Sequence, residues 1–229
     1  MKNTYEWVIV RIDGQIAAIS TDYAALATIT AKLAQQKSPA HKEITAVTVG
    51  FDEVWEIRKN AKWEDLLLFG TDFQKKVWRQ LWELTHPGQT ETGLTHSGAT
   101  IAAKESAEAT EEETSAAKGG AEAGRRGQRL ISYSDFADLC QNRAGVRAVA
   151  HAIGLNPISV VIPCHLVIPK ESIDRIMEIK KKAEATIFKG VDLCLNPILK
   201  NETIDFGNYA LGPVLKRRLI ALELTGEEL

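Results

Sequence analysis

The stretch from Asn156 to Val167 constrains the fold most, because it presents a thiol between a proline and a histidine at the end of an apolar run. Residues 158–162 are β-branched or small, which favours an extended segment packed on both sides. Pro163 ends this run directly before Cys164. We therefore expect the thiol at a rigid, partly desolvated edge, although a cysteine in apolar surroundings is usually an inert core residue.

The composition is that of a globular protein with a core of its own. Of the 229 residues, 45% are hydrophobic, which is enough for one large or two smaller domains. No apolar run is long enough to cross a membrane, and the first residues lack the apolar core of a signal peptide. These features predict an intracellular protein that contacts no membrane.

The cysteines and the charges narrow the class further. Three cysteines without paired spacing argue against a disulfide framework, and the lack of a CxxC pair argues against an ordinary zinc site. The net charge of -2 does not by itself suggest a nucleic-acid binder. A local basic face can coexist with it, because five arginines fall within a short span: Arg125, Arg126, Arg129, Arg143 and Arg147.

The first 69 residues are expected to form an α+β supporting domain. Residues 7–12 and 16–19 are strand-like and flank Asp13-Gly14, a typical hairpin turn. Apolar residues at helical spacing predict a helix over about 23–36, and residues 44–51 read as another strand. No catalytic constellation is evident before about residue 69.

An amphipathic helix should open the second domain, residues 70–229. Apolar residues recur at every third or fourth position from Phe73 to Leu84. Thr71 is a plausible N-cap, with Gln74 completing a capping box. From about residue 91 to 128 large apolar side chains almost vanish, so we expect a disordered or loosely helical surface insertion, with a stable helix over 99–117 as the alternative.

Two short helices joined by a tight turn are expected next. Ser132 can cap the first, with Asp135 three residues later. A turn at residues 142–145 leads into the second, residues 146–153, which is built largely from alanine and valine. This is the sequence shape of a helix-turn-helix, with Arg147 as the long polar group, although small-residue helices also occur as ordinary packed helices.

Taken together, residues 70–81, 131–156 and 162–167 resemble the O6-alkylguanine-DNA alkyltransferase family. The signature Pro-Cys-His stands at residues 163–165, and Asn-Pro and Arg-Ala-Val precede it at the family's spacing. A Gly-x-Tyr-x-x-Gly loop follows at 207–212, and residues 216–223 resemble the closing helix. The resemblance covers most of residues 70–223 apart from insertions at about 91–130 and 170–204.

The resemblance implies an α+β fold. A small amino-terminal α/β domain with a β-sheet, residues 1–69, would precede a mostly helical alkyltransferase domain, residues 70–229, that contains a helix-turn-helix. Within the second insertion, residues 171–182 read as a charged helix with isoleucines along one side.

The resemblance also implies a DNA repair protein that is used once. The thiolate of Cys164 would take a methyl or other alkyl group from O6 of guanine in duplex DNA and keep it as S-alkylcysteine. His165 would take the thiol proton through a water, Glu223 would hold and polarise His165, and Asn156 would keep the cysteine aimed. We expect a monomer without a cofactor or metal, in the nucleus or cytoplasm, and leave cooperative binding along DNA open.

The damaged base must leave the duplex to reach the thiol. In the family, the second helix of the pair enters the minor groove and Arg147 would replace the extruded base in the stack. Tyr133 would crowd the 3′ phosphate and favour rotation of the nucleotide. The rest of the expected DNA-binding face consists of Arg143, Ala148 and His151.

The guanine itself would be held mostly by backbone groups. The carbonyls of Cys164 and Val167 would accept from its exocyclic amine, Tyr209 would donate to N3, and the amide of Ala210 would reach O6. Two departures from the family bear on this site: Leu166 replaces the usual arginine, and Leu211 occupies a position that is glycine in broad-pocket members. We hypothesise that Leu211 disfavours benzyl-sized groups.

Two other functions compete with this reading. One is a damaged-DNA binder on the same scaffold that performs no transfer, but members of that kind lack the cysteine. The other is a thiol hydrolase using Cys164 and His165. Adjacent residues rarely place their side chains for direct proton transfer, and no oxyanion-hole motif is evident.

Overall fold

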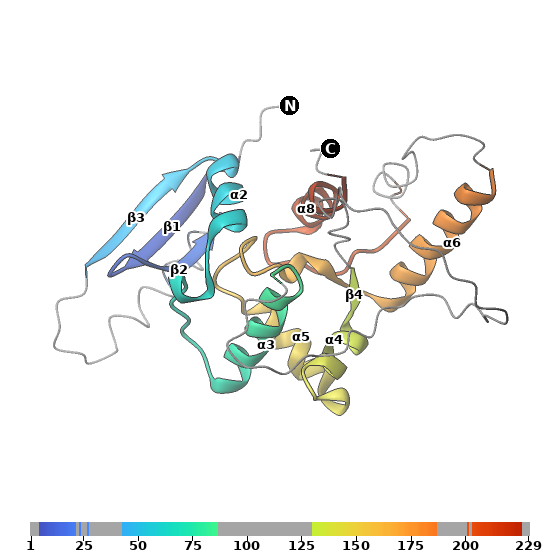
Figure 1. Cartoon of the computed structure of the whole chain (residues 1–229), viewed down its shortest axis with the longest axis horizontal. Helices are drawn as coiled ribbons and strands as arrows, with labels where there is room; N and C mark the ends of the chain where they lie inside the picture. The colour runs from blue at the N-terminus through green and yellow to red at the C-terminus, as the bar shows by residue number, and fades with distance from the viewer. Residues whose placement is uncertain are drawn as a thin grey trace, which may run out of the picture. The chain divides into compact units, whose positions relative to one another are not determined.

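The computed structural model describes residues 5–21, 23, 27, 43–86, 130–186, 201 and 203–225, with side chains described up to residue 179 in the long helix that begins at residue 170 (Figure 1). By its internal contacts the chain divides into one unit formed by Met1–Gln89 and Gln128–Leu229 and a second, Thr90–Gly127. All described residues belong to the first unit. The expected helix over 23–36, the insertion at 91–130 and Cys194 lie wholly or almost wholly outside them.

The α+β class is confirmed by the elements of this unit. In chain order they are β1 (Trp7–Ile12), β2 (Gln15–Ser20), β3 (Ile44–Val49), α2 (Phe51–Asn60), α3 (Asp72–Glu83), β4 (Ile131–Ser132), α4 (Tyr133–Leu139), α5 (Val146–Gly154), β5 (Val167–Ile168), α6 (Lys170–Thr186) and α8 (Pro213–Thr225). Single 3₁₀ turns cover Trp63–Asp65, Arg143–Gly145 and Cys164–Leu166. The domain boundary at residues 69 and 70 stays a prediction.

The amino-terminal sheet is antiparallel, in the order β2-β1-β3. Its first hairpin is the one predicted from the sequence. Asp13 and Gly14 have φ angles of 49° and 83°, so both central residues adopt the left-handed conformation that a two-residue type I′ turn requires. The short polar side chain of Asp13 tolerates that conformation, and Gly14 has no side chain to strain it.

The sheet and the helices of the second part share one hydrophobic core. Side chains alternate across β1, so that Trp7 and Ile9 face this core while Val8 and Val10 lie with Ala18 on the opposite face. The shared core also contains buried residues of α2, α3, α4, α5 and α8. The amino-terminal sheet is therefore packed against the same interior that holds the cysteine.

Local signals predicted α3 well. Thr71 Oγ1 accepts from the backbone N–H of Gln74, and the Gln74 side chain accepts from the backbone N–H of Thr71. This reciprocal pair is the expected capping box. Further along, the indole N–H of Trp78 donates to the carbonyl of Ala152 over 2.8 Å, which ties α3 to α5 in the interior.

The expected pair of short helices is present as α4 and α5. Ser132 caps α4 by accepting from the backbone N–H of Asp135 over 3.0 Å. The 3₁₀ turn Arg143–Gly145 leads directly into α5. One side of α5 is buried through Val149, Ala152 and Ile153, so its other side remains available to solvent.

The expectation of an extended segment over residues 158–162 was wrong. The run is buried as expected, but it folds back on itself: the N–H of Ile162 donates to the carbonyl of Ile158, and Val160 has a φ of 72°. The left-handed conformation is rare for a β-branched residue and is strained. The run is therefore a buried turn, which the Asn156 side chain bridges by donating to the carbonyls of Ile158 and Ile162.

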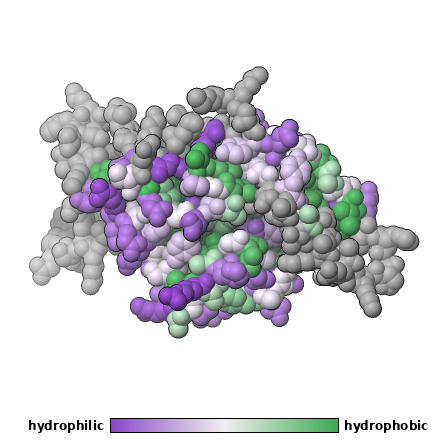
Figure 2. All heavy atoms as spheres, turned by 180° about the vertical axis from the view of Figure 1, so that it is seen from behind, coloured by the Kyte–Doolittle hydropathy of each residue, from purple (hydrophilic) through white to green (hydrophobic). Residues whose placement is uncertain are grey.

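The charged helix expected in the second insertion is α6. Its apolar side packs on a separate cluster, in which Ile176 is buried with Ile168, Phe206 and Ile220. Polar contacts add to this packing, since the Ser172 hydroxyl donates to the carbonyl of Asp205. Figure 2 shows the rear face of the molecule, where hydrophilic and hydrophobic residues are interspersed. No helix within the described residues is long and apolar enough to span a membrane.

Candidate active site

Cys164 begins the 3₁₀ turn that follows Pro163, and it is 7% exposed. The side chain of Asn156 orients it by donating through Nδ2 to the thiol sulfur over 3.2 Å. The same nitrogen lies 2.9 Å from the carbonyl of Ile162, and Oδ1 accepts from the N–H of Ile158. Asn156 thus connects the backbone of the buried turn to the sulfur. Its role in aiming the cysteine stays a prediction.

The amino-terminal sheet contacts the same turn. The N–H of Ile19 in β2 donates to the carbonyl of Pro157 over 3.0 Å, and the N–H of Ser159 donates back to the carbonyl of Ile19 over 3.1 Å. These two bonds form a short parallel bridge between β2 and the segment before the cysteine. Hence the part of the chain without a recognisable motif supports the backbone of the site.

His165 and Glu223 meet although 58 residues separate them. Nε2 of His165 lies 3.1 Å from Oε1 of Glu223, and both side chains are almost completely buried. A carboxylate can only accept hydrogen bonds, so Nε2 carries the hydrogen and Nδ1 carries a lone pair. Nδ1 has no hydrogen-bond partner among the described residues. The histidine is therefore arranged as a proton acceptor through Nδ1.

The pKa values of this pair agree with that assignment. Burial lowers the pKa of His165 and outweighs the hydrogen bond and charge of Glu223, which act in the opposite direction. Burial acts to raise the pKa of Glu223, but the hydrogen bonds and charges of His165 and Arg58 together lower it. At neutral pH the pair thus consists of a neutral imidazole and an ionised carboxylate.

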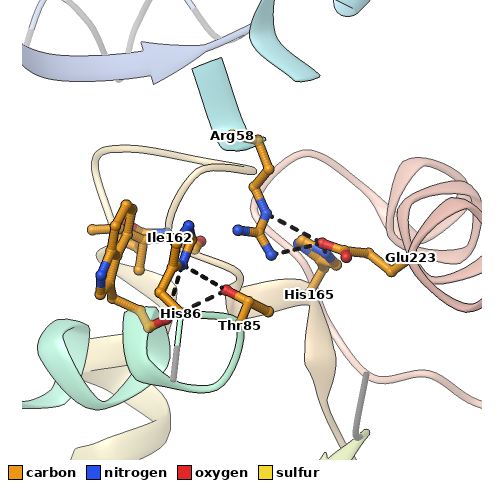
Figure 3. A network of polar contacts seen from close by, with 8 residues as sticks. Arg58, Thr85, His86, Ile162, His165 and Glu223 are labelled. Atoms are coloured by element: carbon orange, nitrogen blue, oxygen red, sulfur yellow. Dashed lines mark hydrogen bonds and ion pairs between the residues drawn. The ribbon is translucent and has the colours of Figure 1, made fainter. Parts of the chain in front are cut away.

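Arg58 is a member of the site that sequence reasoning missed. It lies near the end of α2 and donates to Oε1 of Glu223 through Nε over 3.2 Å and through Nη2 over 3.0 Å (Figure 3). Its side chain is 5% exposed. One signal was available in the sequence, because Arg58 follows the buried Val54 by four residues and so continues the apolar side of α2.

Three further side chains surround the thiol. Tyr133, Tyr209 and Lys216 each lie close enough to Cys164 for an ionised thiol to raise their pKa values. The ammonium of Lys216 donates to the carbonyl of Val167 over 2.8 Å and lies 5.9 Å from the centre of the Tyr133 ring. Burial lowers the pKa of Lys216 to about 8, against the opposing influence of Cys164 and Asp205. Lys216 was expected only as part of the closing helix.

The thiol itself is protonated in this environment. Burial raises the pKa of Cys164 more than Asn156, Lys216 and Tyr209 together lower it. Because the thiolate is the nucleophile, the sulfur needs a proton acceptor before it can attack carbon. His165 is the neutral base nearest in sequence, and within the described residues no hydrogen bond joins it directly to the sulfur.

The structure places the expected guanine contacts around the cysteine in part. The carbonyls of Cys164 and Val167 each already accept one hydrogen bond, from the Val167 N–H and from Lys216 respectively. A carbonyl has a second lone pair, so each retains one acceptor site. The Tyr209 hydroxyl is buried, its pKa raised well above the ordinary value by burial and then by Cys164, whereas Ala210 is exposed.

The expected DNA-contacting residues lie apart from this buried cluster, on α5 and the turn before it. Arg147, Ala148 and His151 are all exposed and share the side of α5 opposite to its buried face. Arg143 is also exposed, and its nearest carboxylate is that of Asp138 at 3.7 Å. Among the described residues no three histidine, cysteine or acidic side chains converge as a metal site.

Comparison with known proteins confirms the resemblance. Residues 126–184 match the family model of the DNA-binding domain of 6-O-methylguanine DNA methyltransferase. A relative from Acanthamoeba polyphaga mimivirus, named a "probable methylated-DNA–protein-cysteine methyltransferase", is 32% identical over 108 residues, 47% of this chain and 45% of its own length. The inducible methylated-DNA–protein-cysteine methyltransferase of Bacillus subtilis is 54% identical over 39 residues, 17% of this chain and 22% of its own. Each match thus spans less than half of the curated relative.

Two solved structures match the chain at low sequence identity. The O6-methylguanine-DNA methyltransferase of Pyrococcus kodakaraensis is 18% identical with a TM-score of 0.45, covering 95% of this chain and 91% of that one. The Mycobacterium tuberculosis protein OGT, solved in complex with DNA, is 22% identical with a TM-score of 0.35, covering 69% and 52%. Scores this low support no inference about function.

Proposed function

We propose that this chain, which carries the DNA-binding domain of the O6-methylguanine DNA methyltransferase family, removes alkyl groups from O6 of guanine in duplex DNA. The acceptor is its own Cys164, and each molecule acts once. Such a repair protein would act wherever the cell's DNA lies, in the nucleus or cytoplasm.

The observation that carries this proposal is the arrangement of a buried, oriented thiol beside a neutral histidine with a free lone pair. Asn156 aims the sulfur, and Glu223 fixes the hydrogen of His165 on Nε2. Nδ1 is then the atom that accepts the thiol proton, through a bridging water. A thiol with a raised pKa needs this acceptor, since it contains little thiolate at neutral pH.

The transfer follows as one displacement at carbon. The sulfur of Cys164 forms a bond to the alkyl carbon while the bond between that carbon and O6 breaks, and its electron pair goes to the guanine. Tyr209 donates a hydrogen bond to N3 of the departing guanine. The thiol proton, taken up by His165, passes through solvent to the guanine anion, so that the base leaves neutral. The thioether that remains has no proton to give up, so the molecule is spent.

Delivery of the base depends on the exposed side of α5. Arg147 and Ala148 would enter the minor groove, with Arg147 taking the place of the extruded nucleotide. Arg143 and His151 would contact the strand on either side, and Tyr133 would crowd the 3′ phosphate. The small side chains of this helix allow its backbone to approach the groove closely.

The test is incubation of the protein with duplex DNA carrying O6-methylguanine labelled in its methyl group, followed by peptide mass mapping. We expect one methyl per chain, on Cys164. Binding to the duplex with no label on Cys164 would instead identify a damaged-DNA binder. Turnover beyond one methyl per chain would exclude the single-use mechanism.

A further inference from the structure

The ion pair between Arg58 and Glu223 connects the amino-terminal part of the chain to the proton acceptor. Arg58 comes from α2, Glu223 from α8 and His165 from the turn after the cysteine, and Figure 3 shows the three side chains converging. Both Arg58 and His165 donate to the same oxygen, Oε1. Any movement of that oxygen therefore changes both contacts at once.

In the cluster of Arg58, Glu223 and His165, the guanidinium cation neutralises the carboxylate, and His165 stays neutral beside them. This balance of charge requires Arg58. Without the cation, a buried carboxylate would keep the imidazole as its sole partner, and a proton on the imidazole would then be the available compensation. A protonated imidazole has no lone pair on Nδ1, so it could not receive the thiol proton.

The end of α2 is itself held in place. His86 stacks on the Trp82 ring, with centroids 3.7 Å apart, and hydrogen-bonds to the backbone of Arg58. Nδ1 of His86 also lies 3.0 Å from the hydroxyl of Thr85 and 3.2 Å from the carbonyl of Trp82. These contacts hold the backbone of α2 at Arg58, the residue whose guanidinium reaches Glu223.

We propose that Arg58 is a positioning residue for the transfer reaction: through Glu223 it keeps His165 neutral and oriented, so that the amino-terminal domain takes part in the proton relay. The proposal rests on the proposed function, since it concerns the same relay. Together with the bridge between Ile19 and the segment before Cys164, it gives the amino-terminal domain two points of control over the site. One acts on the backbone that carries the sulfur and the other on the base.

The charged and titratable groups that face His165 determine the direction in which its pKa should shift when Arg58 is replaced. Glu223 raises its pKa, while Arg58 and Lys216 lower it. Cys164 precedes it in the chain, and His86 lies on the far side of Arg58. Removing the Arg58 charge therefore raises the pKa of His165 and moves the acid limb of the rate profile to higher pH.

The experiment compares Arg58→Gln and Arg58→Lys in the full chain, with Lys59→Met as the control. Lys59 is the next residue of α2 and pairs with Glu56 on the exposed surface. We expect Arg58→Gln to slow methyl transfer from duplex DNA at pH 7 by about ten- to a hundredfold, which reaches the lower end of the roughly 10²- to 10⁴-fold that a general base contributes. The acid limb of its pH–rate profile should move to higher pH. Arg58→Lys should return that limb to its original pH and restore part of the rate. Neither variant should change the Kd for DNA.

The proton on His165 gives a readout that does not depend on transfer. NMR titration of its ring should show a higher pKa in Arg58→Gln than in the natural protein, even if neither protein transfers a methyl group. A raised pKa of His165 without methyl transfer would support the role of Arg58 and contradict the proposed function. An unshifted His165 titration, or a rate loss equal to the loss of folded protein with no change in the pH profile, would overturn the inference.

A second pair of variants covers the case in which Arg58→Gln does not fold. Glu223→Gln removes the carboxylate, and the double variant Arg58→Gln/Glu223→Gln removes both charges and leaves no unpaired buried ion. We expect the pKa of His165 to be higher in the double variant than in Glu223→Gln alone, since only the latter keeps the cation. Equal pKa values in these two proteins would contradict the inference.

Discussion

The buried cluster around Cys164 and the exposed side of α5 differ in how many of their contacts are made inside the molecule. Around the cysteine, Asn156, His165 and Glu223 have reached their partners through contacts inside the molecule. On α5, Arg147 and His151 are exposed to solvent. In the proposed mechanism the side chains around the thiol are thus positioned before DNA binds, whereas the exposed side of α5 would gain its contacts only in the complex.

This contrast predicts that variants in the two regions fail in different measurements. A change near the cysteine should reduce the rate of transfer and leave the affinity for DNA alone. A change on α5 should slow transfer from duplex DNA but leave the rate of reaction with the free base O6-methylguanine unchanged. A variant that lowers the rate of transfer and the affinity for DNA equally would show that the two regions do not act separately.

The largest effect is expected from Cys164→Ala, which should abolish methyl transfer because it removes the sulfur that accepts the methyl group. Binding to duplex DNA, measured by fluorescence anisotropy, should stay within about twofold. Cys140→Ala is the matched control: Cys140 is also buried, but burial raises its pKa to about 11 and it lies at the end of α4. Methyl transfer to Cys140 would break the assignment of the nucleophile.

Asn156→Ala should come next, because it removes the donor to the sulfur together with three bonds across the buried turn. Leaving buried polar groups without partners costs about 1–3 kcal/mol each, so the free energy of unfolding should fall by about 2 kcal/mol. The transfer rate of the protein that remains folded should fall by about tenfold, since the thiol is no longer aimed. A rate unchanged per folded molecule would reduce Asn156 to a structural residue.

Arg147→Ala tests the other region. Loss of the side chain that replaces the extruded base should slow transfer from duplex DNA by about tenfold, which is about 1.4 kcal/mol of base-flipping free energy. The slow reaction with the free base O6-methylguanine should keep its rate, because no flipping is involved. Equal losses on both substrates would place Arg147 in the chemistry and break the comparison.

The smallest effect is expected from Arg143→Ala. Arg143 is exposed, and its contact with Asp138 is long at 3.7 Å, so stability should not change measurably. If it contacts a phosphate, its loss should lower the dependence of log Kd on log salt by about one and weaken binding a few-fold at low salt. A salt dependence identical to that of the natural protein would remove Arg143 from the DNA-contacting surface.

The features predicted best from the sequence are those fixed within a few residues. The type I′ turn at Asp13-Gly14 and the caps at Thr71 and Ser132 were all confirmed, because each depends on backbone and side-chain atoms at most three residues apart. The run at 158–162 failed for the opposite reason. Its composition suits a strand, but the Asn156 side chain satisfies its carbonyls in a turn, and tertiary context overrides propensity.

The residues of the site likewise differ in whether the sequence predicted them. The proximity of His165 and Glu223 came from the resemblance, since nothing in the local pattern joins residues 58 positions apart. Arg58 has no motif around it, and an arginine near a lysine at a helix end usually lies in solvent. Its role depends on a fold that brings α2 against α8, which local periodicity does not encode.

The Arg58–Glu223 contact also bears on when the protein becomes competent during synthesis. The two residues are 165 positions apart, and α8 is the last helix that the structure describes in the chain. Contacts of such long sequence separation form late, because the closure of a large loop must precede them. If the proposed relay is correct, a nascent chain on the ribosome would carry its nucleophile well before it carries the means to activate it, and reactivity would appear only when α8 has docked.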